Sequence, residues 1–229
     1  MRDYTKALLY FEKVLEIQRY SLPQNHPDFA ATYNNIGLVY YSMKEYSKAL
    51  SFYEKTLEVD EETLPPKHLN SASTYNNIGG VYESMGEYSK ALSSHEKALE
   101  IEQESLPSNH PDLASSYNNI GLVYKSMSEY SKALSSLEKA LEIRQQSLPS
   151  NHPDLANSYG SIGMVYTKMG EYSKALLSHE KALEIQQQAL PLNHRDLASS
   201  YYYIGDVYDS MGEYSKALSS HEKALEIRQ

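Results

Sequence analysis

The chain has 229 residues, of which 30 are acidic and 21 are basic, so its formal net charge at pH 7 is −9. A net negative field disfavours nucleic acid and anionic membranes as partners, whereas neutral or basic peptides fit it better. The absence of cysteine excludes disulfides and thiolate chemistry, and no apolar run approaches the ~20 residues of a membrane span. We therefore expect a soluble, cytoplasmic protein that binds neither nucleic acid nor membrane.

The chain repeats itself with a period of 42 residues. Thirty-two of the 42 residues from Met85 to Ser126 recur identically from Met127 to Lys168. A fixed period of this length is the signature of a repeat array, in which neighbouring units share a core. We expect a single array over 1–229, cut from a longer one. Residues 1–22 form the unpaired second helix of a preceding repeat, and five repeats follow at 23–64, 65–106, 107–148, 149–190 and 191–229.

Each repeat begins with a predicted helix, here named helix A. In the third repeat Asn109-His110-Pro111-Asp112 is typical of a helix start, with a polar cap, an early Pro and an acid in the first turn. Apolar residues follow at helical spacings, and Gly121 leaves room for another helix to approach closely. The second and fifth repeats lack parts of this motif after His68 and His194, so we expect displaced or frayed helix starts there.

A turn and a second predicted helix, helix B, complete the repeat. Three sister repeats carry Gly86, Gly170 and Gly212 at the place of Ser128, as a left-handed helix cap prefers. Helix B then runs from Tyr130 until Pro stops it, with Lys and Glu on its solvated face. Two amphipathic helices cannot bury their own apolar faces, so stacking is obligatory. The sequence predicts an all-α fold, an α-solenoid of antiparallel helix pairs.

The repeated pattern is similar to the tetratricopeptide (TPR) signature, and in the first repeat it reads Tyr33-x2-Ile36-Gly37-x2-Tyr40, then Ala49-x3-Tyr53. Long units with Asn-His-Pro-Asp, Tyr-Asn-Asn-Ile-Gly and Lys-Ala-Leu-Glu-Ile resemble the kinesin light chain class. This resemblance implies a right-handed superhelix whose concave wall, made by the A helices, receives extended peptide segments of partner proteins. It implies no catalysis.

The resemblance also implies that an Asn of helix A binds the backbone of the ligand. The matching positions are Asn35, Asn77 and Asn119, with Asn34, Asn76 and Asn118 beside them. Successive A helices lie ~10 Å apart and an extended peptide advances ~3.3 Å per residue, so one Asn would serve about three ligand residues. The alternative is that these are solvated polar positions copied by recent duplication.

Specificity is expected where the repeats differ. On the A helices the fourth repeat replaces Asn-Asn by Gly160-Ser161, and the fifth offers an aromatic and acidic patch of Tyr202, Tyr203, Asp206 and Asp209. Such a patch suits a partner with basic and apolar groups. The kinesin light chain class resembles a basic receptor for acidic cargo, whereas the predicted groove here offers mainly Lys125 and Lys168 against the acidic Glu83, Asp206 and Asp209.

The histidines also recur, which argues for architecture because a catalytic centre is normally singular. One per repeat precedes helix A, where we expect capping or loop packing: His26, His68, His110, His152 and His194. Three more, His95, His179 and His221, take the helix B position of Tyr53 and Leu137, which predicts a semi-buried packing slot. No phosphate loop, zinc spacing or nucleophile elbow is present. We expect no enzyme activity, no metal and no cofactor.

The sequence thus predicts a non-enzymatic scaffold or adaptor that binds partner peptides in its groove, in the manner of kinesin light chain cargo binding. An alternative is an accessory recruiting array of a larger enzyme or signalling protein. A third interpretation is self-association, because apolar residues mark both ends of the array and uncapped ends could stack: Leu8, Phe11 and Leu15 at one end, and Leu218, Leu225 and Ile227 at the other.

Overall fold

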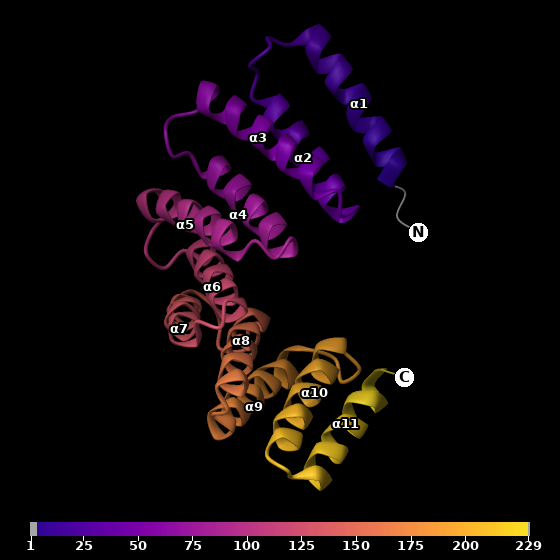
Figure 1. Cartoon of the computed structure of the whole chain (residues 1–229), viewed down its shortest axis with the longest axis vertical. Coiled ribbons are helices and arrows are strands. Elements are labelled where there is room, and N and C mark those ends of the chain that lie inside the picture. The colour runs from indigo at the N-terminus through magenta and orange to yellow at the C-terminus, as the bar shows by residue number, and fades with distance from the viewer. Residues whose placement is uncertain (1–3, 229) are drawn as a thin grey trace. The chain divides into compact units, whose positions relative to one another are not determined.

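The computed structural model describes residues 4–228, and within that range every regular element is an α-helix (Figure 1). The helices form two compact units, one ending at Pro107 and the next beginning at Ser108. The first unit contains α1 (Tyr4–Ser21), α2 (Asp28–Ser42), α3 (Tyr46–Thr63), α4 (Leu69–Ser84) and α5 (Tyr88–Ser105). The second contains α6 (Pro111–Ser126), α7 (Tyr130–Ser147), α8 (Pro153–Met169), α9 (Tyr172–Ala189), α10 (Arg195–Ser210) and α11 (Tyr214–Arg228). The predicted all-α class of antiparallel helix pairs is confirmed.

Each A helix begins with a histidine cap. The imidazole Nδ1 accepts a hydrogen bond of 3.2 Å from the backbone N–H two residues further on. The five pairs are His26–Asp28, His68–Asn70, His110–Asp112, His152–Asp154 and His194–Asp196. This bond satisfies one of the backbone donors that a helix start leaves without an intrahelical partner. The capping interpretation of these histidines is confirmed.

The prediction of displaced helix starts in the second and fifth repeats is wrong. Helix α4 begins at Leu69 and α10 at Arg195, each directly after its capping histidine, just as α6 begins at Pro111. The cap requires only the imidazole and the backbone N–H two residues on. Neither the Pro nor the Asp of the motif is needed to fix the start.

The turns between A and B helices use the left-handed conformation that was predicted. Gly86, Gly170 and Gly212 have φ of 75° or 76°, and Ser128 has the same hand at 62°. Because this conformation closes the helix and reverses the chain, helix B returns antiparallel beside helix A. A non-glycine residue such as Ser128 adopts it at some energetic cost.

The recurring Ile-Gly step of helix A makes room for one side chain of helix B. A Cβ placed on Gly121 would lie 2.7 Å from Leu137 Cγ, and one on Gly163 would lie 2.7 Å from His179 Cε1. The slot residues of four repeats are at most 1% exposed: Tyr53, His95, Leu137 and His179. The predicted close approach is confirmed, and in these repeats the slot is fully buried rather than semi-buried.

Helix B of one repeat also packs on helix A of the next within each unit. Ala133 and Leu137 of α7 form one apolar cluster with Ile162 and Val165 of α8. In the first unit Leu15 of α1 is buried against Phe29 and Ile36 of α2, with Leu8 and Phe11 at the edge of the same cluster. The expectation that this face of α1 lies open is therefore wrong, because α2 covers it.

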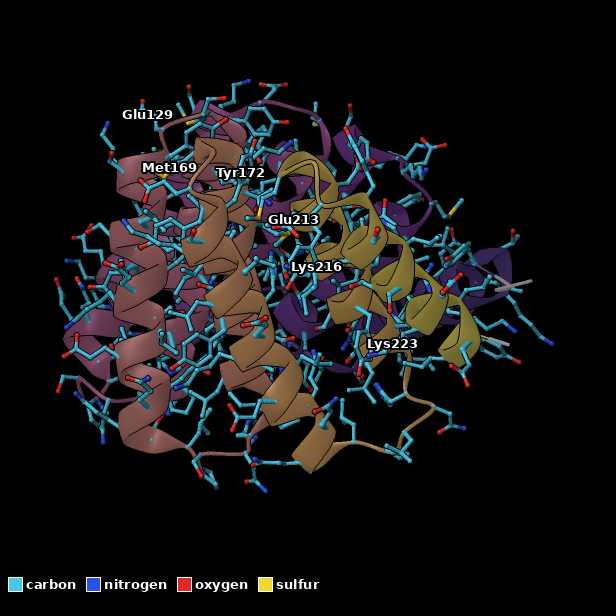
Figure 2. All side chains as sticks on the ribbon, turned by 90° about the horizontal axis from the view of Figure 1, so that it is seen from below. Glu129, Met169, Tyr172, Glu213, Lys216 and Lys223 are labelled. Carbon is cyan, nitrogen blue, oxygen red and sulfur yellow. The ribbon has the colours of Figure 1, made fainter. Side chains whose placement is uncertain are left out.

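The lysines of helix B cover tyrosine rings of helix A. Lys216 Nζ lies 5.3 Å from the centroid of the Tyr208 ring and 2.8 Å from a carboxylate oxygen of Glu213. Lys223 lies over Tyr201 in the same way, at 5.4 Å. Figure 2 labels Lys216 and Lys223 on α11 and Glu213 directly before its start. These side chains are exposed, as predicted, and they also shield aromatic surface through cation–π contacts.

Candidate functional site

Two of the predicted asparagines join neighbouring A helices in the first unit. The side-chain Nδ2 of Asn77 on α4 donates a hydrogen bond of 3.0 Å to Oδ1 of Asn34 on α2. Both side chains are half-buried, and Asn35, beside them, is exposed. A primary amide has two N–H donors and two acceptor lone pairs, so the pair retains capacity for further bonds.

Asn76, the residue before Asn77, takes part in a polar network inside the repeat. Its Oδ1 is 2.8 Å from Nδ1 of His95, and its Nδ2 donates to Oε1 of Glu102 at 3.3 Å. The other ring nitrogen of His95 is 2.9 Å from Oε1 of Glu83. This network links α4 to α5 and holds the buried imidazole in place. Asn76 thus has a structural role, whatever it adds to ligand binding.

The predicted residues of α6 and α8 lie at different depths. Asn118, Asn119 and Lys125 are half-buried on α6, and Lys168 is exposed in the last turn of α8. A Cβ placed on Gly160 of α8 would meet no atom within 4 Å. The surface of α8 is therefore open at the place where α6 has the side chain of Asn118.

The predicted patch of the fifth repeat is brought together on α10, and we call Tyr202, Tyr203, Asp206 and Asp209 the α10 patch. The two tyrosine rings meet edge to face with centroids 5.9 Å apart, and 44% of Tyr202 and 39% of Tyr203 are exposed. Tyr203 stacks on the buried imidazole of His179 from α9, with centroids 5.5 Å apart. The patch is thus an exposed aromatic pair with a buried base beneath it.

His221 of α11 belongs to the same site, although sequence reasoning assigned it only a packing slot. Its ring centroid is 5.2 Å from that of Tyr202, and its Nε2 is 3.8 Å from Oδ1 of Asp206. Tyr202, Asp206 and His221 line a pocket of about 330 Å³. Burial raises the pKa of Asp206, and the neighbouring His221 opposes this rise. His179 and His221 occupy the same slot position in successive repeats, but His179 is buried and His221 is half-buried. The sequence alone does not distinguish the two.

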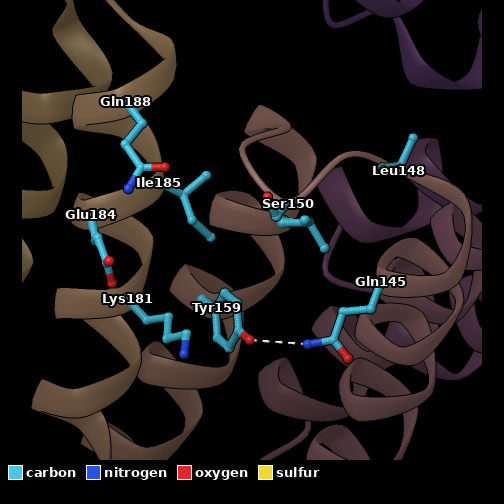
Figure 3. A pocket seen from close by; sticks show the side chains of 9 residues that line it. Gln145, Leu148, Ser150, Tyr159, Lys181, Glu184, Ile185 and Gln188 are labelled. Carbon is cyan, nitrogen blue, oxygen red and sulfur yellow. Dashed lines mark hydrogen bonds between the residues drawn. The ribbon is translucent and has the colours of Figure 1, made fainter.

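A second pocket in this unit lies on α7, α8 and α9 and has a volume of about 400 Å³. Figure 3 shows it, with the amide of Gln145 donating to the hydroxyl of Tyr159 at 3.0 Å. Lys181 lies over the Tyr159 ring at 5.9 Å. Gln187 repeats the contact by donating to the hydroxyl of Tyr201 at 3.1 Å. Because the arrangement recurs from one repeat to the next, we interpret it as inter-repeat packing.

Across residues 4–228, no three His, Cys, Asp or Glu side chains are grouped so that they could hold a metal ion. In the same range no helix has the length and apolar character that crossing a membrane requires.

This geometry defines the class: a helical repeat protein built from pairs of A and B helices, with amides and tyrosines at the surface of the A helices. The profile of the tetratricopeptide repeat matches the sequence in five overlapping stretches, 1–62, 28–104, 70–146, 112–188 and 154–229. Together these stretches cover the chain, so it belongs to the tetratricopeptide repeat family.

Solved structures with the same fold include BtubC (BKLC) from P. vanneervenii, which is 22% identical with a TM-score of 0.82 over 99% of this chain and 90% of that one. A putative kinesin light chain of Podosopora anserina, with nearly identical TPR-like repeats, is 21% identical with a TM-score of 0.76 over 89% and 96%. YrrB, described as a TPR protein with an unusual peptide-binding site, is 24% identical with a TM-score of 0.55 over 95% and 92%. A search of the curated proteins gives no match.

Proposed function

We propose that the protein is a non-enzymatic scaffold that binds extended peptide segments of partner proteins on the exposed faces of its A helices. The tetratricopeptide repeat fold is generally a non-catalytic scaffold for protein interactions, and YrrB, which has this fold, has a peptide-binding site. Cargo binding in the manner of a kinesin light chain is a narrower form of the same proposal.

The observation that carries the proposal is the α10 patch. Tyr202 and Tyr203 are large and exposed. Each ring also packs against a histidine of a neighbouring helix, which restricts its conformation. A tyrosine restricted in this way loses little conformational entropy on binding, and such rings are typical anchors of protein interfaces. The carboxylates of Asp206 and Asp209 add negative charge at the same place. A segment with basic and apolar side chains is the ligand that this combination favours.

The amides of the A helices support an extended backbone as the shared part of the ligand. Asn34 and Asn77 form a polar bridge between α2 and α4, and Asn35 projects beside it. Side-chain amides can both donate to a peptide C=O and accept from a peptide N–H, whatever the peptide sequence. The equivalent Asn118 and Asn119 on α6 have the same chemistry. Lys125 and Lys168 add the basic groups at the ends of α6 and α8.

A peptide-display selection on the purified protein tests this function. We expect enrichment of a motif with basic and apolar residues. The variant Asp206→Asn/Asp209→Asn should lose the basic preference, and Tyr202→Ser should lose most of the enrichment. The matched control is Tyr20→Ser, because Tyr20 is 96% exposed on α1, outside the patch. A selection that enriches no motif, or that enriches the same motif with every variant, would contradict the proposal.

A second candidate is association between copies of the chain. Leu218 and Leu225 are largely exposed on α11, and Leu9, Val14 and Ile17 are exposed on the outer face of α1. Exposed apolar side chains at this density favour association when they form a shared surface. Molar mass from light scattering should then rise with concentration in the native chain and stay monomeric in Leu218→Glu/Leu225→Glu. A constant monomer mass in both proteins would exclude this role.

A further inference from the structure

A polar pocket of about 250 Å³ lies in the first unit and is lined by residues of α2, α3 and α4. Its wall includes Asn34 of α2, Thr56 and Asp60 of α3, and Ser73 and Thr74 of α4. The volume is enough for several water molecules or for the end of a long side chain. No predicted site other than Asn34 involves these residues.

Asp60 contributes a carboxylate that the fold leaves without a partner. The residue is only 2% exposed, and its Oδ2 is buried with no hydrogen-bond partner. Burial raises the pKa of Asp60, while the nearby His68 opposes this rise. A buried carboxyl oxygen without a partner is costly, so its presence beside a pocket needs an explanation.

The same position in the second unit shows what a satisfied residue looks like. Arg144 Nη1 donates to the hydroxyl of Ser158 at 2.6 Å, and Ser200 donates to Oε1 of Gln186 at 2.7 Å. In both cases the side chain of helix B bonds to a hydroxyl of the next helix A. The hydroxyl equivalent to these is Thr74, but it donates to the backbone O of Asn70 at 3.2 Å. Asp60 therefore lacks the bond that Arg144 and Gln186 make. In the first unit the same position is occupied by Glu102, which accepts a hydrogen bond from Asn76, and by Gln18, which also has a buried Oε1 without a hydrogen-bond partner.

The hydroxyls of the pocket offer acceptors rather than donors. Thr56 donates its hydrogen to the backbone O of Phe52 at 3.1 Å, and Ser73 donates to that of Leu69 at 3.5 Å. A hydroxyl has one hydrogen, so these groups, like Thr74, face the pocket with lone pairs. Apart from the amides of Asn34 and Asn70, the polar side chains that line the pocket with Asp60 are hydroxyls, and each has lone pairs that can accept a hydrogen bond. Such a lining suits a cation with several N–H donors.

We propose that this pocket binds a primary ammonium group, as an ion pair with Asp60 and with hydrogen bonds to the surrounding hydroxyl oxygens. An ammonium has three donors and no acceptor, which complements this lining. Lysine side chains and free peptide amino termini both carry this group. The inference rests on the proposed function only for the source of the amine, which would be a peptide bound across α2 and α4.

The first test uses n-butylammonium chloride as the probe, with sodium chloride at equal ionic strength as the reference. Amide resonances of Asn34, Ser73 and Thr74 in the full chain should shift saturably with the amine. In Asp60→Asn the apparent affinity should fall by about tenfold or more, as expected for loss of a charge-assisted hydrogen bond. No saturable shift in the native protein, or equal shifts in the variant, would overturn the proposal.

Folding of the variant is a second readout. Asp60→Asn removes a buried carboxyl group whose Oδ2 has no hydrogen-bond partner, so its melting temperature should equal or exceed that of the native protein. A side chain that is retained for binding often lowers the stability of the folded protein, so its replacement can raise the melting temperature. If Asp60→Asn unfolds, Asp60→Gln takes its place, because Gln186 fills the equivalent position in the fourth repeat. A marked loss of stability in both variants would show that Asp60 is structural and would overturn the proposal.

Two peptides distinguish the source of the amine. One has a single lysine and an acetylated amino terminus, and the other has a free amino terminus and no lysine. If one peptide binds more tightly and this preference is lost in Asp60→Asn, that peptide identifies the source of the amine. If Asp60→Asn changes the binding of neither peptide, the proposal is contradicted. Amine binding without any motif from display selection would remove the proposed function alone. A selected motif without amine binding would remove this inference alone.

Discussion

The imidazole of His179 lies flat against the ring of Tyr203, with centroids 5.5 Å apart and planes 15° from parallel. His179 is 1% exposed, and burial lowers its pKa to about 4. One face of the α10 patch therefore rests on a base that is neutral at physiological pH. Charging this ring would place an uncompensated cation in the core beneath the patch.

Acid should destabilise the protein through His179. Because its folded-state pKa lies below the ordinary 6.5, His179 is protonated in the unfolded chain but not in the folded chain between these two pH values. The contribution of His179 to stability is complete above about pH 6.5 and is lost as the pH falls toward 4, by at most about 3 kcal/mol. Urea unfolding at pH 7 and pH 5 measures this loss.

His179→Leu is the variant that isolates the effect, because Leu137 fills the same slot in the third repeat. All other residues are the same in both proteins, so only the difference between the native chain and the variant counts. We expect the variant to lose less stability between pH 7 and pH 5. An identical loss in both proteins would mean that His179 is not protonated preferentially in the unfolded chain.

Two glycines of α8, three residues apart, should respond in opposite directions to alanine. Gly163→Ala places a Cβ 2.7 Å from the buried His179 ring, which should destabilise the protein by about 1–3 kcal/mol through overpacking. Gly160→Ala meets nothing within 4 Å and should stabilise the helix by about 0.5–1 kcal/mol. Denaturant midpoints of both variants check this. Changes of the same sign would refute the assignment of the packing slot.

The histidine caps should make a measurable contribution to helix stability. His110→Ala removes the acceptor of the Asp112 N–H and should cost about 1 kcal/mol. His110→Asn provides another good cap and should recover most of that loss. Thermal unfolding of the two variants measures the difference. If both unfold at the same temperature, the contact of His110 is incidental.

The sequence was sufficient for the fold because each local signal agreed with the period. The Gly at the place of Ser128 predicted the left-handed turn, and the Ile-Gly step predicted the close approach of helix B. The prediction was wrong at the starts of α4 and α10, because it treated Pro and Asp as necessary for the helix start, whereas the side chains of His68 and His194 make the capping hydrogen bond. One imidazole acceptor is enough to fix a helix start.

The candidate site could be predicted only in part. The sequence indicated Tyr202, Tyr203 and Asp206, but not that His221 lies beside them, because the same slot position can be buried or open depending on the side chains packed around it. The expectation that specificity lies where the A helices diverge does not lead to the Asp60 pocket, because Asp60 lies on helix B. On helix B the position of Asp60 varies among the repeats while the residues before it largely recur, and its equivalents are Gln18, Glu102, Arg144, Gln186 and Arg228. This change of charge among otherwise similar residues is the feature of the sequence that indicates the position of the pocket.

The same variable position supplies the last prediction. The guanidinium of Arg144 is buried and bonds to the hydroxyl of Ser158 at 2.6 Å, and burial lowers its pKa. Ser158→Ala leaves this cation with only a long contact of 3.5 Å to the backbone O of Asp154, which should cost about 1–3 kcal/mol.

Replacing both members should cost less than replacing Ser158 alone. In Arg144→Met/Ser158→Ala an apolar chain of similar length fills the space and no buried charge remains, so we expect stability to return toward the native value. Arg144→Gln should be close to neutral, because Gln186 already bonds to Ser200 in the fourth repeat. A double-mutant cycle by urea unfolding measures the coupling. Strictly additive losses would show that Arg144 and Ser158 do not depend on each other, and that the position varies among repeats for a reason other than its hydroxyl partner.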